Sequence, residues 1–190
     1  MNINISKNKK ITTVLFIIVL FSSVIMAVLF RNNLVYHSNI GSYIERLYRQ
    51  PMTIRVDKEL TYKGRTYRII FSTPKDKKDE LYVQCFEEKL NGNFYKPTYG
   101  AIQGKSKSLY GMICCYSDDG THNSFAVVYG YNKELKANSF NVKEADDGGW
   151  IAQDISKDEY FLYTYSNIVY PLVNFKDIHN NDINTIFDGQ

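Results

Sequence analysis

Two patterns of hydrophobic positions divide the chain. A continuous apolar run extends from Ile11 to Phe30 without a charged residue. Because a helix rises 1.5 Å per residue, such a run reaches across the roughly 30 Å hydrocarbon core of a bilayer. From Thr53 onward, hydrophobic and polar residues alternate, which is typical of half-buried strands. The pattern predicts one transmembrane helix followed by a β-rich domain.

The apolar run has the features of an uncleaved signal anchor. It is longer than the apolar core of a cleaved signal peptide, which has about 7–15 residues. A cleavage site after Ala27 would place Ile25 where a small residue is needed, and no cysteine lies near the end of the run to carry a lipid. We therefore expect Ile11 to Phe30 to stay in the membrane.

The basic residues beside the anchor predict its orientation. Lys7, Lys9 and Lys10 precede the apolar run, and Arg31 alone follows it directly. The positive-inside rule then places residues 1–10 in the cytoplasm as a tail. The chain is expected to be a single-pass protein of the cell membrane with an extracellular C-terminal domain.

A stalk at residues 31–52, with a short amphipathic helix, is predicted between the anchor and the domain. The apolar positions of this juxtamembrane helix recur every three or four residues. They are Ile40, Tyr43, Ile44, Leu47 and Tyr48. Pro51 is expected to end the helix. The apolar stripe is expected to pack on the domain; the alternatives are a position in the lipid interface, helped by Arg46 and Arg49, or pairing with a partner helix.

Residues 53–190 are predicted to form an extracytoplasmic β-domain. Four runs, TYRIIFS, ELYVQCF, SFAVVYGY and YFLYTYS, combine alternation with β-branched and aromatic residues. Turn signals such as Lys63-Gly64 and Asn91-Gly92 separate the runs, and the charged segment Lys75–Glu80 is typical of a hairpin tip. The expected fold is mainly β, an all-β sandwich or small barrel, with α+β as the alternative. A helical turn is expected only within residues 133–145.

Composition narrows the class of partner. A content of 44% hydrophobic residues excludes a disordered chain, and 16 tyrosines favour strands. The net charge is +3, but the basic excess lies at the membrane end of the chain. The domain is therefore not expected to bind nucleic acid.

The three cysteines are Cys85, Cys114 and Cys115. Neighbouring residues of a strand face opposite sides of a sheet, so only one of Cys114 and Cys115 can meet Cys85. Outside the membrane a disulfide is permitted, and an odd number of cysteines leaves one thiol over. We interpret the cysteines as small buried hydrophobic residues. Neither a metal site nor a cofactor is expected.

A loop around His122 is the only candidate for catalysis. It contains Asp118 and Asp119, and Cys115 precedes it. Residues of this kind form catalytic triads, but hairpin turns use the same residues. No known nucleotide-binding, metal-binding or nucleophile motif occurs in the chain. We therefore assign no catalytic residue and expect a protein that is not an enzyme.

Aromatic residues supply the candidate ligand-binding positions. Trp150 follows two glycines, and a lone tryptophan in this context is expected in a core or, alternatively, as an exposed platform for sugars or a partner protein. Tyr95 and Tyr99 flank Lys96 and are candidates to line a groove for a polysaccharide or a peptide. Trp150, Tyr95 and Tyr99 are the predicted ligand-binding residues.

Two segments, FAVVYGYNKELKANSFNVK and EYFLYTYSNIVYPLVNFKDIHNNDI, carry a resemblance. With the frequent Asn, Lys and Ile, they resemble uncharacterised small membrane-anchored extracytoplasmic proteins of low-GC Gram-positive bacteria. The resemblance implies an outer β-domain that ends in a closing hairpin.

The expected function is a membrane-anchored binding or interaction module of unknown ligand, such as an accessory subunit at the cell envelope. Its expected partner is an envelope protein or a cell-wall polymer. The alternative is an envelope hydrolase that uses the His122 loop.

Overall fold

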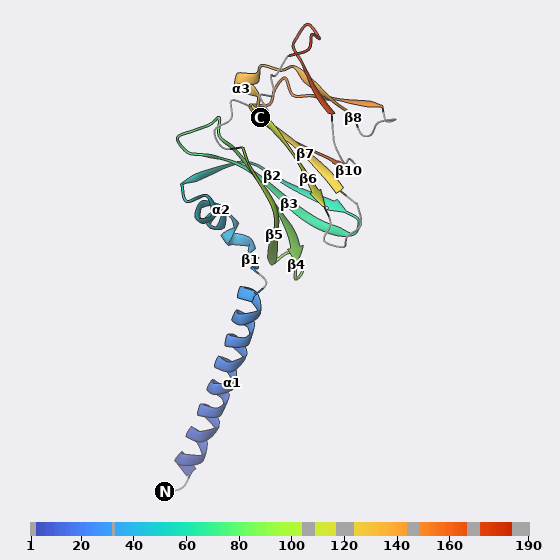
Figure 1. Cartoon of the computed structure of the whole chain (residues 1–190). Coiled ribbons are helices and arrows are strands. Elements are labelled where there is room, and N and C mark those ends of the chain that lie inside the picture. Colours follow the sequence, from blue (N-terminus) through green and yellow to red (C-terminus); the bar gives the residue numbers. More distant parts are fainter. Residues whose placement is uncertain are drawn as a thin grey trace.

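The computed structural model describes residues 3–31, 33–103, 109–116, 124–143, 149–166 and 172–183. A long helix, α1 (Ile3–Arg31), extends away from a β-rich domain (Figure 1). Its segment Ile11–Val28 is apolar and long enough to cross a membrane, and the domain buries none of it. The hydroxyls of Ser22 and Ser23 donate hydrogen bonds to carbonyls one turn earlier, at 2.8 and 2.7 Å, so they leave no polar group unpaired in an apolar setting.

The domain consists of three antiparallel sheets. Sheet A has the order β1 (Val35–Tyr36), β5 (Phe94–Gln103), β4 (Leu81–Lys89), β3 (Arg65–Pro74) and β2 (Met52–Tyr62). Sheet B has the order β10 (Tyr160–Ser166), β7 (Ser124–Tyr131) and β6 (Tyr110–Tyr116). Sheet C has the order β11 (Leu172–Lys176), β8 (Ser139–Lys143) and β9 (Trp150–Asp154). The prediction of a mainly β fold is confirmed.

Sheet B lies between the other two sheets and is buried on both faces. One face of β7, with Phe125, Val127 and Tyr129, packs against β3 and β4 of sheet A. The other face, with Ala126 and Val128, packs against sheet C. A strand buried on both faces needs a nearly continuous apolar sequence, which explains SFAVVYGY.

The juxtamembrane segment is part of the domain. A short 3-10 helix, η1 (His37–Asn39), leads into α2 (Ile40–Tyr48), which covers the outer face of sheet A. Ile40 and Ile44 are buried there against Phe86 and Tyr95. The expectation that the apolar stripe packs on the domain is confirmed for Ile40, Tyr43, Ile44 and Tyr48, whereas Leu47 is 45% exposed. Strand β1 ties the segment to the edge of sheet A.

The short turns of the domain form where the sequence signals predict them. The last two strands, β10 and β11, lie in different sheets. Lys63 and Gly64 both have positive φ and join β2 to β3 in a two-residue hairpin. The helical turn expected after residue 132 is α3 (Asn132–Leu135). The last two strands do not pair with each other, because β10 pairs with β7 in sheet B and β11 pairs with β8 in sheet C. The second half of the domain therefore alternates between two layers.

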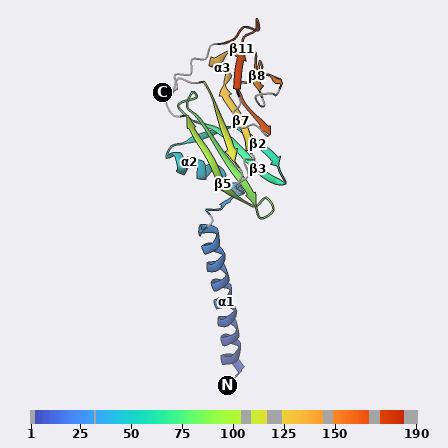
Figure 2. The ribbon, with the colours of Figure 1, turned by 45° about the vertical axis from the view of Figure 1, so that its right-hand side comes forward.

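Sheet C lies at the end of the domain opposite α1. Figures 1 and 2 show its orange and red strands at the top of the molecule, with the anchor at the bottom. The side chains of sheet C therefore lie at the end of the domain farthest from the apolar helix.

Candidate functional site

Trp150 begins β9, the edge strand of sheet C, and its side chain is 54% exposed. The expectation of a core position is therefore wrong. The reason is the register of the strand, in which Ile151 and not Trp150 lies beside the inward-facing Val142. The alternative of an exposed aromatic platform agrees with this position.

The strand register identifies the residues that share a face with Trp150. Residues directly opposite each other in an antiparallel pair point to the same side of the sheet. The outward face of sheet C therefore has three rows, Leu172–Lys143–Trp150, Asn174–Asn141–Ala152 and Lys176–Ser139–Asp154. We call these nine residues the Trp150 face. The three rows extend over about 14 Å along the strands, and the three strands over about 10 Å.

Most of the Trp150 face is polar, with Leu172 and Ala152 as its apolar members besides the ring, and none of its nine residues is buried. The amides of Asn141 and Asn174 lie on adjacent strands at paired positions. Asn174 donates a 2.9 Å hydrogen bond to Asp182, whereas the structure shows no hydrogen bond of the Asn141 side chain within its described part. An amide offers two donors and one acceptor oxygen, so this row can bind hydroxyl groups.

Fixed charges border the amide row. Hydrogen bonds from Ser156, through its side chain and its backbone N–H at 2.8 Å, lower the pKa of Asp154, so this carboxylate is ionised at neutral pH. Lys176 forms an ion pair with Asp182. The Trp150 face therefore combines an aromatic ring, amides and charges of both signs.

The other two predicted ligand-binding residues, Tyr95 and Tyr99, lie in sheet A. Tyr95 is in β5 of sheet A and is only 4% exposed, because α2 and η1 cover it. Burial raises the pKa of its hydroxyl. The backbone of Tyr99 pairs with Cys85 in the same sheet, and its side chain lies outside the described part of the structure. The structure does not bring Tyr95 into contact with Trp150, since sheet B separates sheets A and C.

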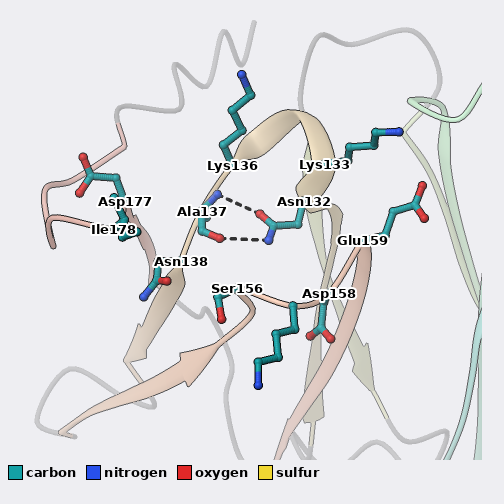
Figure 3. A pocket seen from close by; sticks show the side chains of 11 residues that line it. Asn132, Lys133, Lys136, Ala137, Asn138, Ser156, Asp158, Glu159, Asp177 and Ile178 are labelled. Atoms are coloured by element: carbon teal, nitrogen blue, oxygen red, sulfur yellow. Dashed lines mark hydrogen bonds between the residues drawn. The ribbon is translucent and has the colours of Figure 1, made fainter.

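A pocket of about 630 Å³ lies at one end of sheet C, next to α3 (Figure 3). The buried Asn132 organises it: its amide donates to the carbonyls of Ala137 and Ile155 at 3.0 and 2.7 Å and accepts from the N–H of Ala137 at 2.9 Å. Figure 3 shows the charged ends of Lys136, Asp158 and Asp177 pointing in different directions. The pocket therefore lacks the converging polar groups of an active site.

A second hollow, of about 880 Å³, lies at the opposite end of the domain. It is formed where α1 meets α2, between Met26, Tyr36 and Leu47 among others. Tyr36 and Leu47 are both nearly half exposed. This hollow belongs to the junction between the anchor and the domain.

The catalytic alternative concerns residues outside the described part of the structure, since Asp118, Asp119 and His122 all lie in the gap between β6 and β7. Within the described ranges, no group of three His, Cys, Asp or Glu side chains could hold a metal ion. Sequence reasoning missed Asn141 and Asn174. The alternation in SFNVK and LVNFK places both asparagines on one face of the sheet and the buried phenylalanines Phe140 and Phe175 on the other face.

Comparison with known proteins gives no further assignment. No family model, no curated protein and no solved structure matches the chain.

Proposed function

We propose that the protein is a membrane-anchored binding module whose Trp150 face binds a glycan of the cell envelope. The observation that carries the proposal is the exposed Trp150 ring beside paired asparagine amides on one face of sheet C. The C–H face of a sugar ring packs on an aromatic ring, and its hydroxyls require donors and acceptors close by. A few polar groups around an apolar surface are typical of sites that fix the orientation of a ligand.

The polar character of the face favours a glycan over a protein partner. The centre of a protein interface is depleted of charged residues. On the Trp150 face, by contrast, Lys143, Asp154 and Lys176 surround the amide row. A polyol can use each of these groups as a hydrogen-bond partner, so the face suits an extended sugar chain lying along the strands.

The proposed location is the outer side of the cell membrane. It is supported by the three lysines before the apolar helix and the single Arg31 directly after it. The position of sheet C at the end of the domain opposite α1 suits a ligand that lies away from the lipid surface (Figure 1). The short link between α1 and β1 keeps the whole domain close to the membrane.

The single tryptophan gives a direct test, because all tryptophan fluorescence of the chain comes from Trp150. The full-length protein in detergent is titrated with soluble fragments of purified peptidoglycan and, separately, with wall polysaccharide. Binding is expected to shift the emission to shorter wavelength and to protect the ring from acrylamide quenching. An unchanged spectrum and unchanged quenching with both preparations would contradict the proposal.

Variants distinguish the Trp150 face from nonspecific adhesion. Trp150→Ala is expected to weaken co-sedimentation with insoluble peptidoglycan or precipitated polysaccharide about tenfold, which corresponds to about 1.4 kcal/mol. Asn141→Ala retains the fluorescent ring and is expected to weaken the titration similarly. Leu90→Ala is the matched control, because Leu90 is an exposed apolar residue in the β4–β5 turn of sheet A. Equal losses in Leu90→Ala would indicate nonspecific binding, and capture of an envelope protein that depends on Trp150 would replace the glycan by a protein partner.

A further inference from the structure

Two cysteines meet in the core between sheets A and B. The sulfur atoms of Cys85, in β4, and Cys115, in β6, are 3.3 Å apart. The side chains are 0% and 1% exposed. The two residues are separated by about 30 positions along the chain, and their strands belong to different sheets. A bond between them would therefore join the two layers.

The distance is compatible with a covalent bond after a small adjustment. An S–S bond is about 2.05 Å long, so the two sulfurs would approach each other by about 1.3 Å, which side-chain rotation can supply. The strands themselves come close, with Cα atoms of β4 and β6 within 8 Å of one another.

The third cysteine is directed elsewhere. Cys114 precedes Cys115 in β6 and therefore faces the opposite side of sheet B, where it packs between sheets B and C. It cannot reach Cys85 without turning β6 over. The structure thus selects one of the two pairings that the sequence left open.

We propose that Cys85 and Cys115 are joined by a disulfide in the mature protein. The inference rests on the proposed outer location, where disulfides persist. Two S–H bonds are lost and one S–S bond forms; the two electrons and two protons pass to the disulfide of a thiol oxidoreductase, whose S–S bond breaks to give two thiols.

Burial determines when the bond forms. The contact with Cys85 and the apolar surroundings raise the pKa of the Cys115 thiol well above its usual range, so Cys115 stays protonated in the folded protein. Because the thiolate is the reactive form, the bond forms while the chain folds, before sheets A and B close over it. Once buried, it is protected from reductants, and it acts as a structural link and not as a switch.

The first test uses the full-length protein in its native membranes. Acid quenching and alkylation under denaturing conditions, followed by proteolysis and mass spectrometry, should yield a peptide pair linked between Cys85 and Cys115, with Cys114 alkylated. The Cys114→Ser variant should retain the link. Three alkylated cysteines, or a link from Cys85 to Cys114, would overturn the proposal.

A second test separates the geometry from the location. The purified chain is unfolded in urea, reduced, and refolded with glutathione and glutathione disulfide. The expected product has the same link, and its Tm is about 10 °C above that of the identical chain kept reduced. If the link forms here but is absent from native membranes, the location is wrong. If it does not form here, the geometry is wrong, and the outer location is unaffected.

Discussion

Gly130 lies in β7, in the middle layer of the domain, where both faces of the sheet are covered. A Cβ atom at this position would lie 2.5 Å from Cζ of Phe161 and 2.9 Å from the carbonyl oxygen of Leu109. Phe161 is held between sheets B and C, and the Leu109 carbonyl accepts a 2.8 Å hydrogen bond from Tyr131. Neither neighbour can move freely, so the absence of a side chain at Gly130 is a packing requirement.

Gly130→Ala is therefore expected to destabilise the domain by about 1–3 kcal/mol. Gly41→Ala is the matched control, because a Cβ atom there meets only the Ile54 side chain, at 4.0 Å. Gly41 lies in α2, where alanine stabilises a helix by about 0.5–1 kcal/mol relative to glycine. The check is urea unfolding of both full-length variants, followed by circular dichroism. A stable Gly130→Ala protein would show that Phe161 has room to move.

At the residue scale, the sequence indicated which side chains are chemically distinctive better than it indicated where they lie in the fold. Trp150 was recognisable as a special residue, but its exposure depends on the register of β9 against β8, which no local pattern determines. Asn141 and Asn174 become neighbours only because β8 pairs with β11. Contacts of this kind follow from pairing between distant segments, so they could not be read from the spacing of residues.

At the element scale, local periodicity predicted the strands but could not predict which distant strands pair with each other. The alternation in SFAVVYGY correctly placed Phe125, Val127 and Tyr129 on one face. It did not reveal that the opposite face, with Ala126 and Val128, is also covered. Apolar residues on both faces of a strand suit a middle layer, but similar sequences also occur in two-layer sandwiches.

The helix α2 tests whether the juxtamembrane segment is a stalk or a structural part of the domain. Ile44 is 1% exposed and packs on sheet A, so Ile44→Ala is expected to cost about 2–5 kcal/mol. Leu47, one turn later, is 45% exposed, and Leu47→Ala is expected to change stability by less than about 0.5 kcal/mol. Urea midpoints of the two full-length variants provide the comparison. Equal midpoints would mean that the domain folds without α2.

At the scale of the whole molecule, the layers are stacked in one order from the apolar helix to sheet C. The order is α2, sheet A, sheet B and sheet C, and α1 leaves the domain at the end opposite sheet C (Figures 1 and 2). The stack places sheet C, which carries the Trp150 face, at the end of the domain farthest from α1. The proposed disulfide would join sheets A and B. Sheet C, which carries Trp150, packs on sheet B.

The orientation of α1 determines which compartment the Trp150 face meets, and single cysteines can test it. In a Cys114→Ser background, Ser42→Cys places an exposed thiol on α2, and Ser6→Cys places one before the apolar run. With the N-terminus in the cytoplasm, a membrane-impermeant maleimide should label Ser42→Cys on intact cells. It should label Ser6→Cys only after the cells are opened, because the reagent cannot cross the bilayer. The background protein without an added cysteine controls for Cys85 and Cys115, which are buried. The reverse labelling pattern would place the domain in the cytoplasm. It would contradict both the proposal that the Trp150 face binds an envelope glycan and the proposal of a disulfide between Cys85 and Cys115.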